Sequence, residues 1–331
     1  MRKNFQLNRW GAVLLLAGVT ASCAGLAAPK TTATDQSQVD LATLWIEPAD
    51  LSSRDFFDGA GGRAQAPPDG ARFELIAVDT KGYSGGYDVR DRQGVKWSVK
   101  VGKEAQPEIA VSRILWGLGF HQPAAYLVTN WQVDGASLPP ADLQMARFRR
   151  DSEDQVVVGD WSWYENPFVG TKPFQGLVVA NLMMNNWDWK TSNNKIYELR
   201  NSGERPRQVY VVRDLGASLG KTSFPKFLRL TPMRGFGQGS RNDVAGFEEQ
   251  GFIKGLDGQR VRFHYNGIHN KIVETVTVDD VVWTCRLMAR VSDAQWQDAF
   301  RAAGFAPGDQ QRYIEKLKSK IRDGLALAGP A

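Results

Sequence analysis

The chain has 331 residues, of which 42% are apolar and 23% charged, and its formal net charge is +5 at pH 7. Three basic residues, Arg2, Lys3 and Arg9, lie in an N-terminal segment that we expect to be removed, which lowers the net charge to +2. Such a small excess gives no reason to expect a nucleic-acid partner. The apolar content is enough for one large hydrophobic core or for a core divided between two lobes.

Residues 1–28 have the pattern of a secretory signal peptide. A basic start is followed by a short apolar run over residues 10–20 and then by small residues. The apolar run is too short to cross a bilayer as a permanent helix. Two kinds of processing fit the sequence: cleavage after Ser22 with lipidation of Cys23, or ordinary cleavage near Ala27 or Ala28. We therefore expect an exported protein of the periplasm or cell envelope, held at the membrane only by a lipid anchor at Cys23.

Two segments precede the first convincing strand. Residues 29–50 are rich in Thr, Ala, Asp, Gln and Ser, and Asp58–Gly70 is rich in Gly and Pro. We therefore expect a tether and a lead-in loop over residues 29–70. Strands are predicted next at Arg72–Asp79 and Tyr87–Arg92, with a glycine-rich turn between them.

A third alternating strand, Gly94–Gly102, contains Lys100. Lys103–Gly119 then has its apolar side chains on one face, which predicts a helix. Glu108 would lie at the first or second helical position, where a carboxylate either stabilises the helix dipole or pairs with Lys100. Glu104 is the alternative partner for that lysine.

The rest of the chain is expected to complete the sheet and then to become mainly helical. Ala124–Val133 is predicted to be one more strand. The basic stretch Leu138–Asp154 is typical of a solvated surface. The aromatic stretch Trp161–Pro167 either packs between the lobes or lines a pocket. Helices are predicted at Gly176–Asn185, which is apolar all round, and at Val278–Val291, Ala294–Ala303 and Gln310–Leu327.

A polar loop follows the apolar helix. Asp188, Lys190 and Asn193 have the spacing D-x-K-x-x-N of a protein-kinase catalytic loop, and Asp214 begins Asp-Leu-Gly, a variant of the metal-binding D-F-G. Phosphoryl transfer needs a carboxylate beside the attacking hydroxyl, a cation near the phosphate and oxygen ligands for Mg²⁺. Two β-like runs within residues 195–212 predict a hairpin that brings both aspartates to the same side of one cleft.

Lysine, glutamate, catalytic loop and metal aspartate follow one another in the order found in kinases. The chain thereby resembles atypical protein-kinase-like proteins, namely HipA-type kinases, phosphatidylinositol-kinase-like proteins and secretory-pathway kinases. The resemblance implies an α+β, two-lobed fold, with a small antiparallel β N-lobe over residues 71–134 and a mainly helical C-lobe over residues 135–331. Two departures are visible: the glycine-rich turn lacks G-x-G-x-x-G, and Asn186 stands where the catalytic loop usually has His.

The resemblance also implies that the protein binds ATP with Mg²⁺ and transfers phosphate to a hydroxyl of a protein, sugar or lipid acceptor; transfer of AMP is a variant. It gives roles to the following residues: Asp188 orients or deprotonates the acceptor, Lys190 neutralises the phosphoryl group, Asn193 and Asp214 bind Mg²⁺, Lys100 with Glu108 positions the nucleotide, and Lys81, Gly82, Gly85 and Gly86 contact its phosphates. Gly220–Arg241 would be the activation or substrate segment, although a solvated loop explains its basic residues equally well.

Two other interpretations remain open at this point. The chain is either a catalytically weak or inactive kinase-fold binding or scaffold lipoprotein of the cell envelope, or an unrelated mixed α/β protein in which the motif is accidental. The two departures from the kinase pattern favour a scaffold. The presence of Asp188, Asn193 and Asp214 together favours an enzyme, because a scaffold has no chemical need for all three.

Overall fold

The computed structural model describes residues 39–79, 84–134, 145–200, 207–222 and 239–329. Every described residue belongs to the compact unit Val39–Ala331. The predicted signal peptide with Cys23, the turn residues Lys81 and Gly82, and most of the predicted substrate segment lie outside the described residues.

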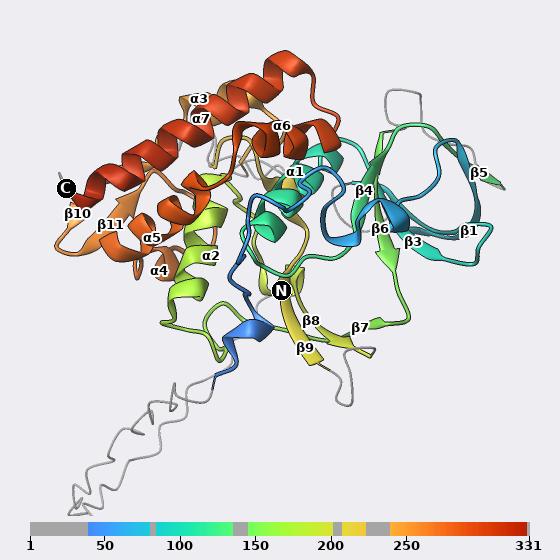
Figure 1. Cartoon of the computed structure of the whole chain (residues 1–331), viewed down its shortest axis with the longest axis horizontal. Coiled ribbons are helices and arrows are strands. Elements are labelled where there is room, and N and C mark those ends of the chain that lie inside the picture. Colours follow the sequence, from blue (N-terminus) through green and yellow to red (C-terminus); the bar gives the residue numbers. More distant parts are fainter. Residues whose placement is uncertain (1–38, 80–83, 135–144, 201–206, 223–238, 330–331) are drawn as a thin grey trace, which may run out of the picture. The chain divides into compact units, whose positions relative to one another are not determined.

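A six-stranded sheet occupies one side of this unit (Figure 1). In spatial order its strands run β4-β6-β3-β2-β1-β5, and neighbours are antiparallel except for the parallel pair β1 and β5. Alternate side chains, among them Phe73, Val89 and Phe148, fill a core of their own, as the two-residue period of a strand requires. The strands are β1 (Ala71–Asp79), β2 (Gly86–Arg90), β3 (Lys96–Val101), β4 (Ala125–Val128), β5 (Trp131–Asp134) and β6 (Ala146–Asp151).

The segment predicted as one strand at Ala124–Val133 forms two strands instead. The chain bends at Thr129 and Asn130, which are polar and exposed. The main-chain oxygen of Asn130 accepts a hydrogen bond from the amide of Gly70, which holds the bend in place. β4 therefore pairs with β6 at one edge of the sheet, whereas β5 pairs with β1 at the opposite edge.

The interpretation of Leu138–Asp154 as a solvated surface is wrong for β6. This strand lies inside the sheet between β3 and β4, and its Arg147 is only 2% exposed. Ala146 and Phe148 fill the apolar core, while the buried charge of Arg147 is paired with a carboxylate. Because β6 belongs to the sheet, the boundary expected at residue 134 falls inside the sheet rather than at its end.

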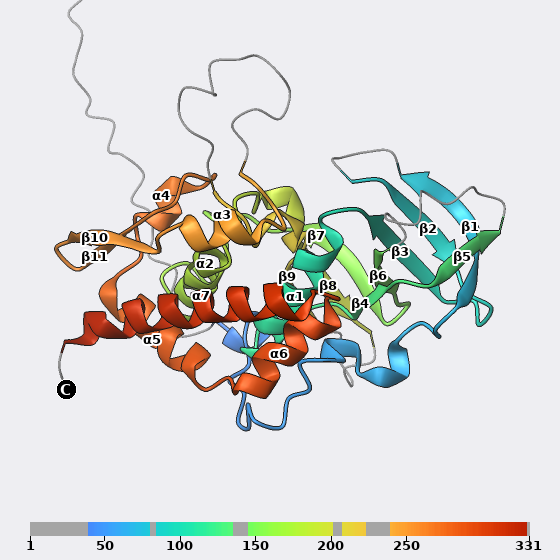
Figure 2. The same ribbon diagram turned by 90° about the horizontal axis from the view of Figure 1, so that it is seen from above.

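Helices make up most of the remaining unit (Figure 1, Figure 2). α1 contacts β4 and β6 as well as α6, so it links the sheet to the helices. Ser292 caps α6 and shares a capping box with Gln295, and the helix starts at Asp293, one residue before the predicted Ala294. The helices are α1 (Ala105–Gly117), α2 (Lys172–Met183), α3 (Val244–Glu249), α4 (Asn270–Val273), α5 (Val278–Ala289), α6 (Asp293–Ala302) and α7 (Pro307–Leu325).

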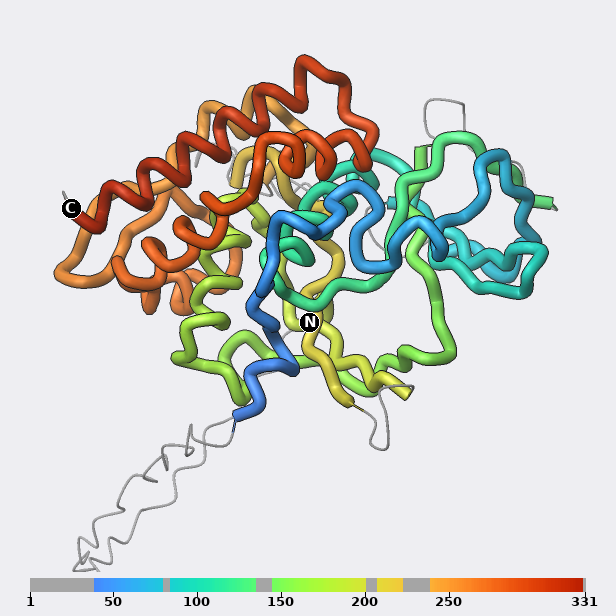
Figure 3. Tube along the Cα trace, viewed as in Figure 1, coloured from blue at the N-terminus to red at the C-terminus, as the bar shows by residue number. Residues whose placement is uncertain are grey.

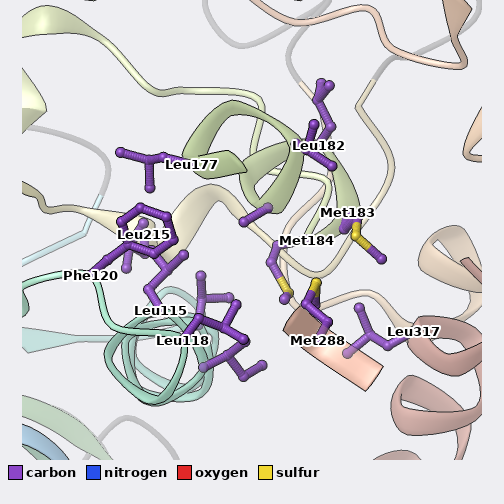
Figure 4. Packing of buried hydrophobic residues seen from close by; sticks show 14 of the residues in the cluster. Leu115, Leu118, Phe120, Leu177, Leu182, Met183, Met184, Leu215, Met288 and Leu317 are labelled. Carbon is purple, nitrogen blue, oxygen red and sulfur yellow. The ribbon is translucent and has the colours of Figure 1, made fainter. Parts of the chain in front are cut away.

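The main hydrophobic core lies among α1, α2, α5 and α7. Figure 4 shows Met183 and Met184, at the end of α2, beside Met288 of α5 and Leu317 of α7. Leu215, from the Asp-Leu-Gly sequence, belongs to the same cluster. The interior part of α2 is buried on all sides, as its apolar sequence predicts. The catalytic-loop sequence therefore begins directly at a rigid, packed helix end.

A three-stranded antiparallel sheet carries the predicted motif. It contains β7 (Gln155–Asp160), β8 (Asn194–Leu199) and β9 (Arg207–Val212), and the hairpin predicted from the sequence is confirmed as β8 and β9. In Figure 3 the chain runs from the six-stranded sheet into β7 and later returns beside it as the hairpin. The amide of Arg213 donates to the main-chain oxygen of Asn193 over 2.9 Å, so both ends of the hairpin lie side by side.

The remaining features complete the α+β fold. A separate hairpin is formed by β10 (Ile253–Asp257) and β11 (Arg260–Phe263). The aromatic stretch after β7 packs into the main core through Trp161 and Trp163. No helix in the described ranges combines the length and apolar character needed to cross a membrane. The predicted fold class, α+β with a small sheet lobe and a mainly helical lobe, is confirmed; the parallel pair β1 and β5 makes the sheet mixed rather than purely antiparallel.

Candidate active site

A cavity of about 220 Å³ is lined by residues of the six-stranded sheet and of the ends of the β8–β9 hairpin. We call it the lysine cavity. Its lining includes Gly85 just before β2, Gly86 at the start of β2, Lys100 from β3, and Asn193 and Asp214 from the two ends of the β8–β9 hairpin. These five predicted site residues, distant in sequence, therefore share one cavity.

Lys100 is surrounded by three carboxylates. Its Nζ lies 3.1 Å from Oε2 of Glu108 and 3.6 Å from Oε2 of Glu104, and it also forms an ion pair with Asp214. The lysine side chain is 17% exposed. Burial opposes its charge, but the charges of Glu108 and Asp214 outweigh burial and raise the pKa of Lys100. Lys100 is thus held as a cation, and both sequence alternatives for its partner are realised.

Glu108 is the buried anchor of this cluster. It lies on the fourth residue of α1, not on the first or second position expected, and its side chain is 6% exposed. Burial alone would raise the pKa of Glu108, but Arg147, Lys100 and Arg149 lower it to about 2. Nε of Arg147 is 2.9 Å from Oε1 of Glu108, and Arg149 is 3.5 Å from the same oxygen.

Two arginines of β6 belong to this cluster although the sequence pattern predicted a solvated surface there. In the β3–β6 register Arg147 is directly opposite Lys100, and Arg149 is opposite Ser98. Residues two apart on a strand point to the same face, so the alternation in Ala-Arg-Phe-Arg-Arg indicates two arginines on one face and a phenylalanine on the other. That pattern was visible, but its pairing with Lys100 depends on the register of a strand far away in sequence.

The catalytic-loop sequence is held by its own hydrogen bonds. Nζ of Lys190 lies 2.8 Å from Oδ2 of Asp188, and Nδ2 of Asn193 donates to the main-chain oxygen of Asp188 over 2.7 Å. Burial and, to a lesser degree, the charge of Asp214 raise the pKa of Asp188 against the opposing effect of Lys190. A carboxylate with a raised pKa is a better proton acceptor than an ordinary one. Asp188 and Lys190 are not part of the lining of the lysine cavity.

Lys320, a buried lysine that no sequence motif indicates, holds the start of this loop through hydrogen bonds. Lys320 of α7 donates to the main-chain oxygen of Met183 and to Oδ1 of Asn185, each over 2.8 Å. Its Nζ also lies 4.1 Å from the ring centroid of Phe247. α7 therefore fixes the point at which α2 ends and the loop starts.

The backbone of the Asp-Leu-Gly sequence has two notable features, the conformation of Asp214 and the close packing at Gly216. Asp214 has φ 60° and ψ 50°, the left-handed region that a non-glycine residue seldom occupies and that is often found at functional sites. A Cβ on Gly216 would lie 2.5 Å from Cβ of Glu104. Only glycine therefore lets this turn approach the start of α1, which keeps Asp214 close to Lys100.

The donor set in the lysine cavity fits Mg²⁺ with a bound phosphate. Asn193 and Asp214 offer an amide oxygen and a carboxylate, which are ligands that Mg²⁺ accepts. Among the described residues no group of three or more His, Cys, Asp or Glu side chains could hold a metal on its own. A metal here would thus depend on phosphate oxygens and water, which is the usual arrangement for Mg²⁺.

The comparisons with known proteins give little beyond this geometry. No protein-family model matches the chain, and no curated protein matches it. One solved structure to which it is similar is that of a Helicobacter pylori proinflammatory kinase, CtkA, with 12% sequence identity and a TM-score of 0.46; the match covers 78% of this chain and 96% of that chain. The geometry of the site therefore carries the functional conclusion.

Proposed function

We propose that the protein is a kinase-like phosphotransferase that binds ATP with Mg²⁺ and transfers phosphate to a hydroxyl acceptor. The observation that carries the proposal is the buried ion pair of Lys100 and Glu108 in contact with Asp214, beside the lysine cavity. A strand lysine paired with a helix glutamate, next to a metal-binding aspartate, is the arrangement on which protein kinases depend.

Each side chain has a defined task in this proposal. Bound ATP with Mg²⁺ supplies the transferable phosphoryl group. Lys100, oriented by Glu108, binds nucleotide phosphate, while Asn193 and Asp214 hold the metal. Asp188 accepts the proton of the acceptor hydroxyl, and Lys190 offsets negative charge on the phosphate. Gly85 and Gly86 would contact the phosphates of the nucleotide from the lining of the cavity. Gly86 also permits close pairing of β2 with β3, because a Cβ there would lie 2.9 Å from the main-chain oxygen of Val99.

Other parts of the proposal rest on the sequence alone. Export, the lipid anchor at Cys23 and the phosphate contacts of Lys81 and Gly82 fall on residues outside the described ranges. Placement among HipA-type, phosphatidylinositol-kinase-like or secretory-pathway kinases also rests on the motif pattern. The acceptor is a protein, sugar or lipid hydroxyl, and AMP transfer at the same metal site is the variant reaction.

One observation favours the alternative of a kinase-fold scaffold without catalysis. Lys100 is already ion-paired with Asp214, so a nucleotide and its metal must displace this contact before both residues can act. A protein in which the ion pair is permanent would keep the fold and lose the reaction. Nucleotide binding therefore separates the two functions.

Thermal unfolding of the purified mature domain, with and without ATP and Mg²⁺, tests the proposal. A ligand selective for the folded state stabilises it by roughly 2.7 kcal/mol at 100 times its dissociation constant. We expect a metal-dependent rise in the midpoint that Asp214→Ala abolishes and that Glu315→Ala, an exposed carboxylate change on α7, leaves intact. No rise at millimolar nucleotide would reject the kinase function and favour the scaffold.

A further inference from the structure

A second cavity, of about 340 Å³, adjoins the lysine cavity, and we call it the arginine cavity. The two share Ser98, Arg149 and Arg213 as lining residues, so they meet at these side chains. The arginine cavity lies where β6 leads into β7, and the β8–β9 hairpin closes its other side. Its charged lining consists of Lys96, Arg149, Arg150 and Arg213 against Asp88 and Asp151.

Positive charge at the junction of the two cavities is poorly balanced. Arg149 reaches a single carboxylate oxygen, Oε1 of Glu108, over 3.5 Å, and that oxygen already binds Arg147 at 2.9 Å. Burial lowers the pKa of Arg149 to about 10, and the positive charges of Arg147 and Arg213 add to this effect. Arg149 is half-buried, and among the described residues its side chain otherwise donates only to the hydroxyl of Ser98, over 3.3 Å. Guanidinium groups with so little compensation indicate that an anion belongs beside them.

Hydrogen-bond donors at the same place are also incompletely used. Arg213 donates from one terminal nitrogen to the hydroxyl of Tyr197 over 2.7 Å, and its guanidinium lies 5.8 Å from the centroid of that ring. Within the described part of the chain, Nε of Arg213 is buried and has no hydrogen-bond partner. An oxyanion would accept a hydrogen bond from this nitrogen and neutralise the charge, because guanidinium and phosphate oxygens match in geometry.

We propose that the arginine cavity is a second oxyanion site, in which Arg149 and Arg213 bind a phosphate-class group without a metal ion. This site is distinct from the position of the phosphate at Lys100 and Asp214. The inference rests on the proposed function for the identity of the ligand. The second oxyanion comes either from the far end of a polyphosphate chain or from a phosphate carried by the acceptor, and both sources share the chemistry that the arginines recognise.

Calorimetric titration in EDTA tests the site without any contribution from Mg²⁺. The probes are tripolyphosphate, for the polyphosphate source, and O-phosphoserine, for a phosphorylated acceptor. We expect one of them to bind the parent protein and to bind Arg213→Gln roughly tenfold to a hundredfold more weakly, because charge-assisted hydrogen bonds are lost. Arg149→Gln should have the same effect, and thermal unfolding checks that both variants are folded.

Two controls make the result specific. Arg262→Gln removes an arginine from β11, which does not line either cavity, and should leave the titration unchanged. Arg213→Lys keeps the charge without the fork geometry and should bind with intermediate affinity. Equal weakening by Arg262→Gln, or no binding of either probe to the parent, would overturn the second site.

Failure of the oxyanion site and failure of the phosphotransferase proposal can be told apart. Asp214→Ala should abolish stabilisation by ATP with Mg²⁺ yet retain oxyanion binding in EDTA, because Asp214 contributes no positive charge to the arginine cavity. Stabilisation by ATP with Mg²⁺ in a parent that binds neither probe in EDTA would leave the proposed function standing and refute the oxyanion site. Oxyanion binding in EDTA by a parent that ATP with Mg²⁺ does not stabilise would support the oxyanion site and refute the proposed function.

Discussion

At the scale of single residues, Glu108 is the side chain on which the site depends most. One buried carboxylate faces Lys100, Arg147 and Arg149 from β3 and β6. Its removal would leave three buried cations close together, and breaking a buried ion pair by deleting one partner costs roughly 3 to 5 kcal/mol. The same side chain thus stabilises the sheet lobe and orients the lysine that binds phosphate in the proposed reaction.

Glu108→Gln should therefore change stability in a pH-dependent way. The pKa of Glu108 is lowered in the folded protein from an ordinary value of 4.5 to about 2. Its ionised form stabilises the fold fully above pH 4.5, and this contribution is lost as the pH falls toward 2. We expect the parent to exceed Glu108→Gln by on the order of 3 kcal/mol near neutral pH, with the difference shrinking through that window.

Urea unfolding of parent and variant across the acidic range measures this difference. Glu315→Gln, on the exposed face of α7, is the matched control and should follow the parent at every pH. A constant difference between parent and Glu108→Gln from neutral to strongly acidic pH would show that the carboxylate is not ionised in the folded protein.

At the scale of elements, the site depends on how closely α1 approaches the turn that follows β9. The 3₁₀ turn Leu215–Ala217 contacts α1, and Leu215 lies in the main core. Gly216 allows this contact because Glu104 occupies the space of any Cβ. The position of Asp214 is thus set by packing between two elements rather than by the local sequence alone.

Gly216→Ala should separate these elements. The added Cβ would lie 2.5 Å from Cβ and 3.0 Å from the main-chain oxygen of Glu104, so the backbone must move. We expect a loss of about 1 to 3 kcal/mol of stability, as for other overpacked sites, and a weaker midpoint rise with ATP and Mg²⁺. Differential scanning fluorimetry with and without ligand reports both effects.

Gly308→Ala is the control for this prediction. Gly308 lies in α7 with no atom within 4 Å of an added Cβ, so alanine should be neutral or stabilising there by up to about 1 kcal/mol. Equal destabilisation by both changes would mean that packing against Glu104 is not the reason why position 216 requires glycine.

At the scale of the whole unit, the sequence predicts elements that depend on neighbouring residues, but not contacts between residues that are far apart in the chain. The β8–β9 hairpin, the apolar helix α2 and the Ser292 cap each follow from patterns within a few residues. Arg147 was missed because its partner depends on strand pairing across the sheet. Lys320 was missed because it meets Met183 only after α7 comes up to the C-terminal end of α2 in the folded protein. An isolated lysine in an amphipathic helix is otherwise typical of a solvated face.

Lys320 provides a test of that long-range contact. Burial lowers the pKa of Lys320 well below the ordinary 10.5, so the unfolded chain binds a proton more strongly than the folded protein does. Stability of the parent should therefore rise with pH as the pH approaches 10.5 from below. Lys320→Met removes this titration, and its stability should vary less with pH over that window.

Urea unfolding at several mildly alkaline pH values compares the two proteins. The control is Lys318→Met, a partly exposed position two residues earlier in α7 that binds Asp293. Lys318→Met should keep the pH dependence of the parent, because Lys320 is intact. Loss of the two hydrogen bonds to Met183 and Asn185 should also loosen the start of the catalytic loop, so that Lys320→Met weakens the midpoint rise with ATP and Mg²⁺ whereas Lys318→Met does not. If the free energies of unfolding of the parent and Lys320→Met vary with pH in parallel, Lys320 is not a buried lysine that titrates beside the loop. In that case only α1 and the β8–β9 hairpin would hold the site in place.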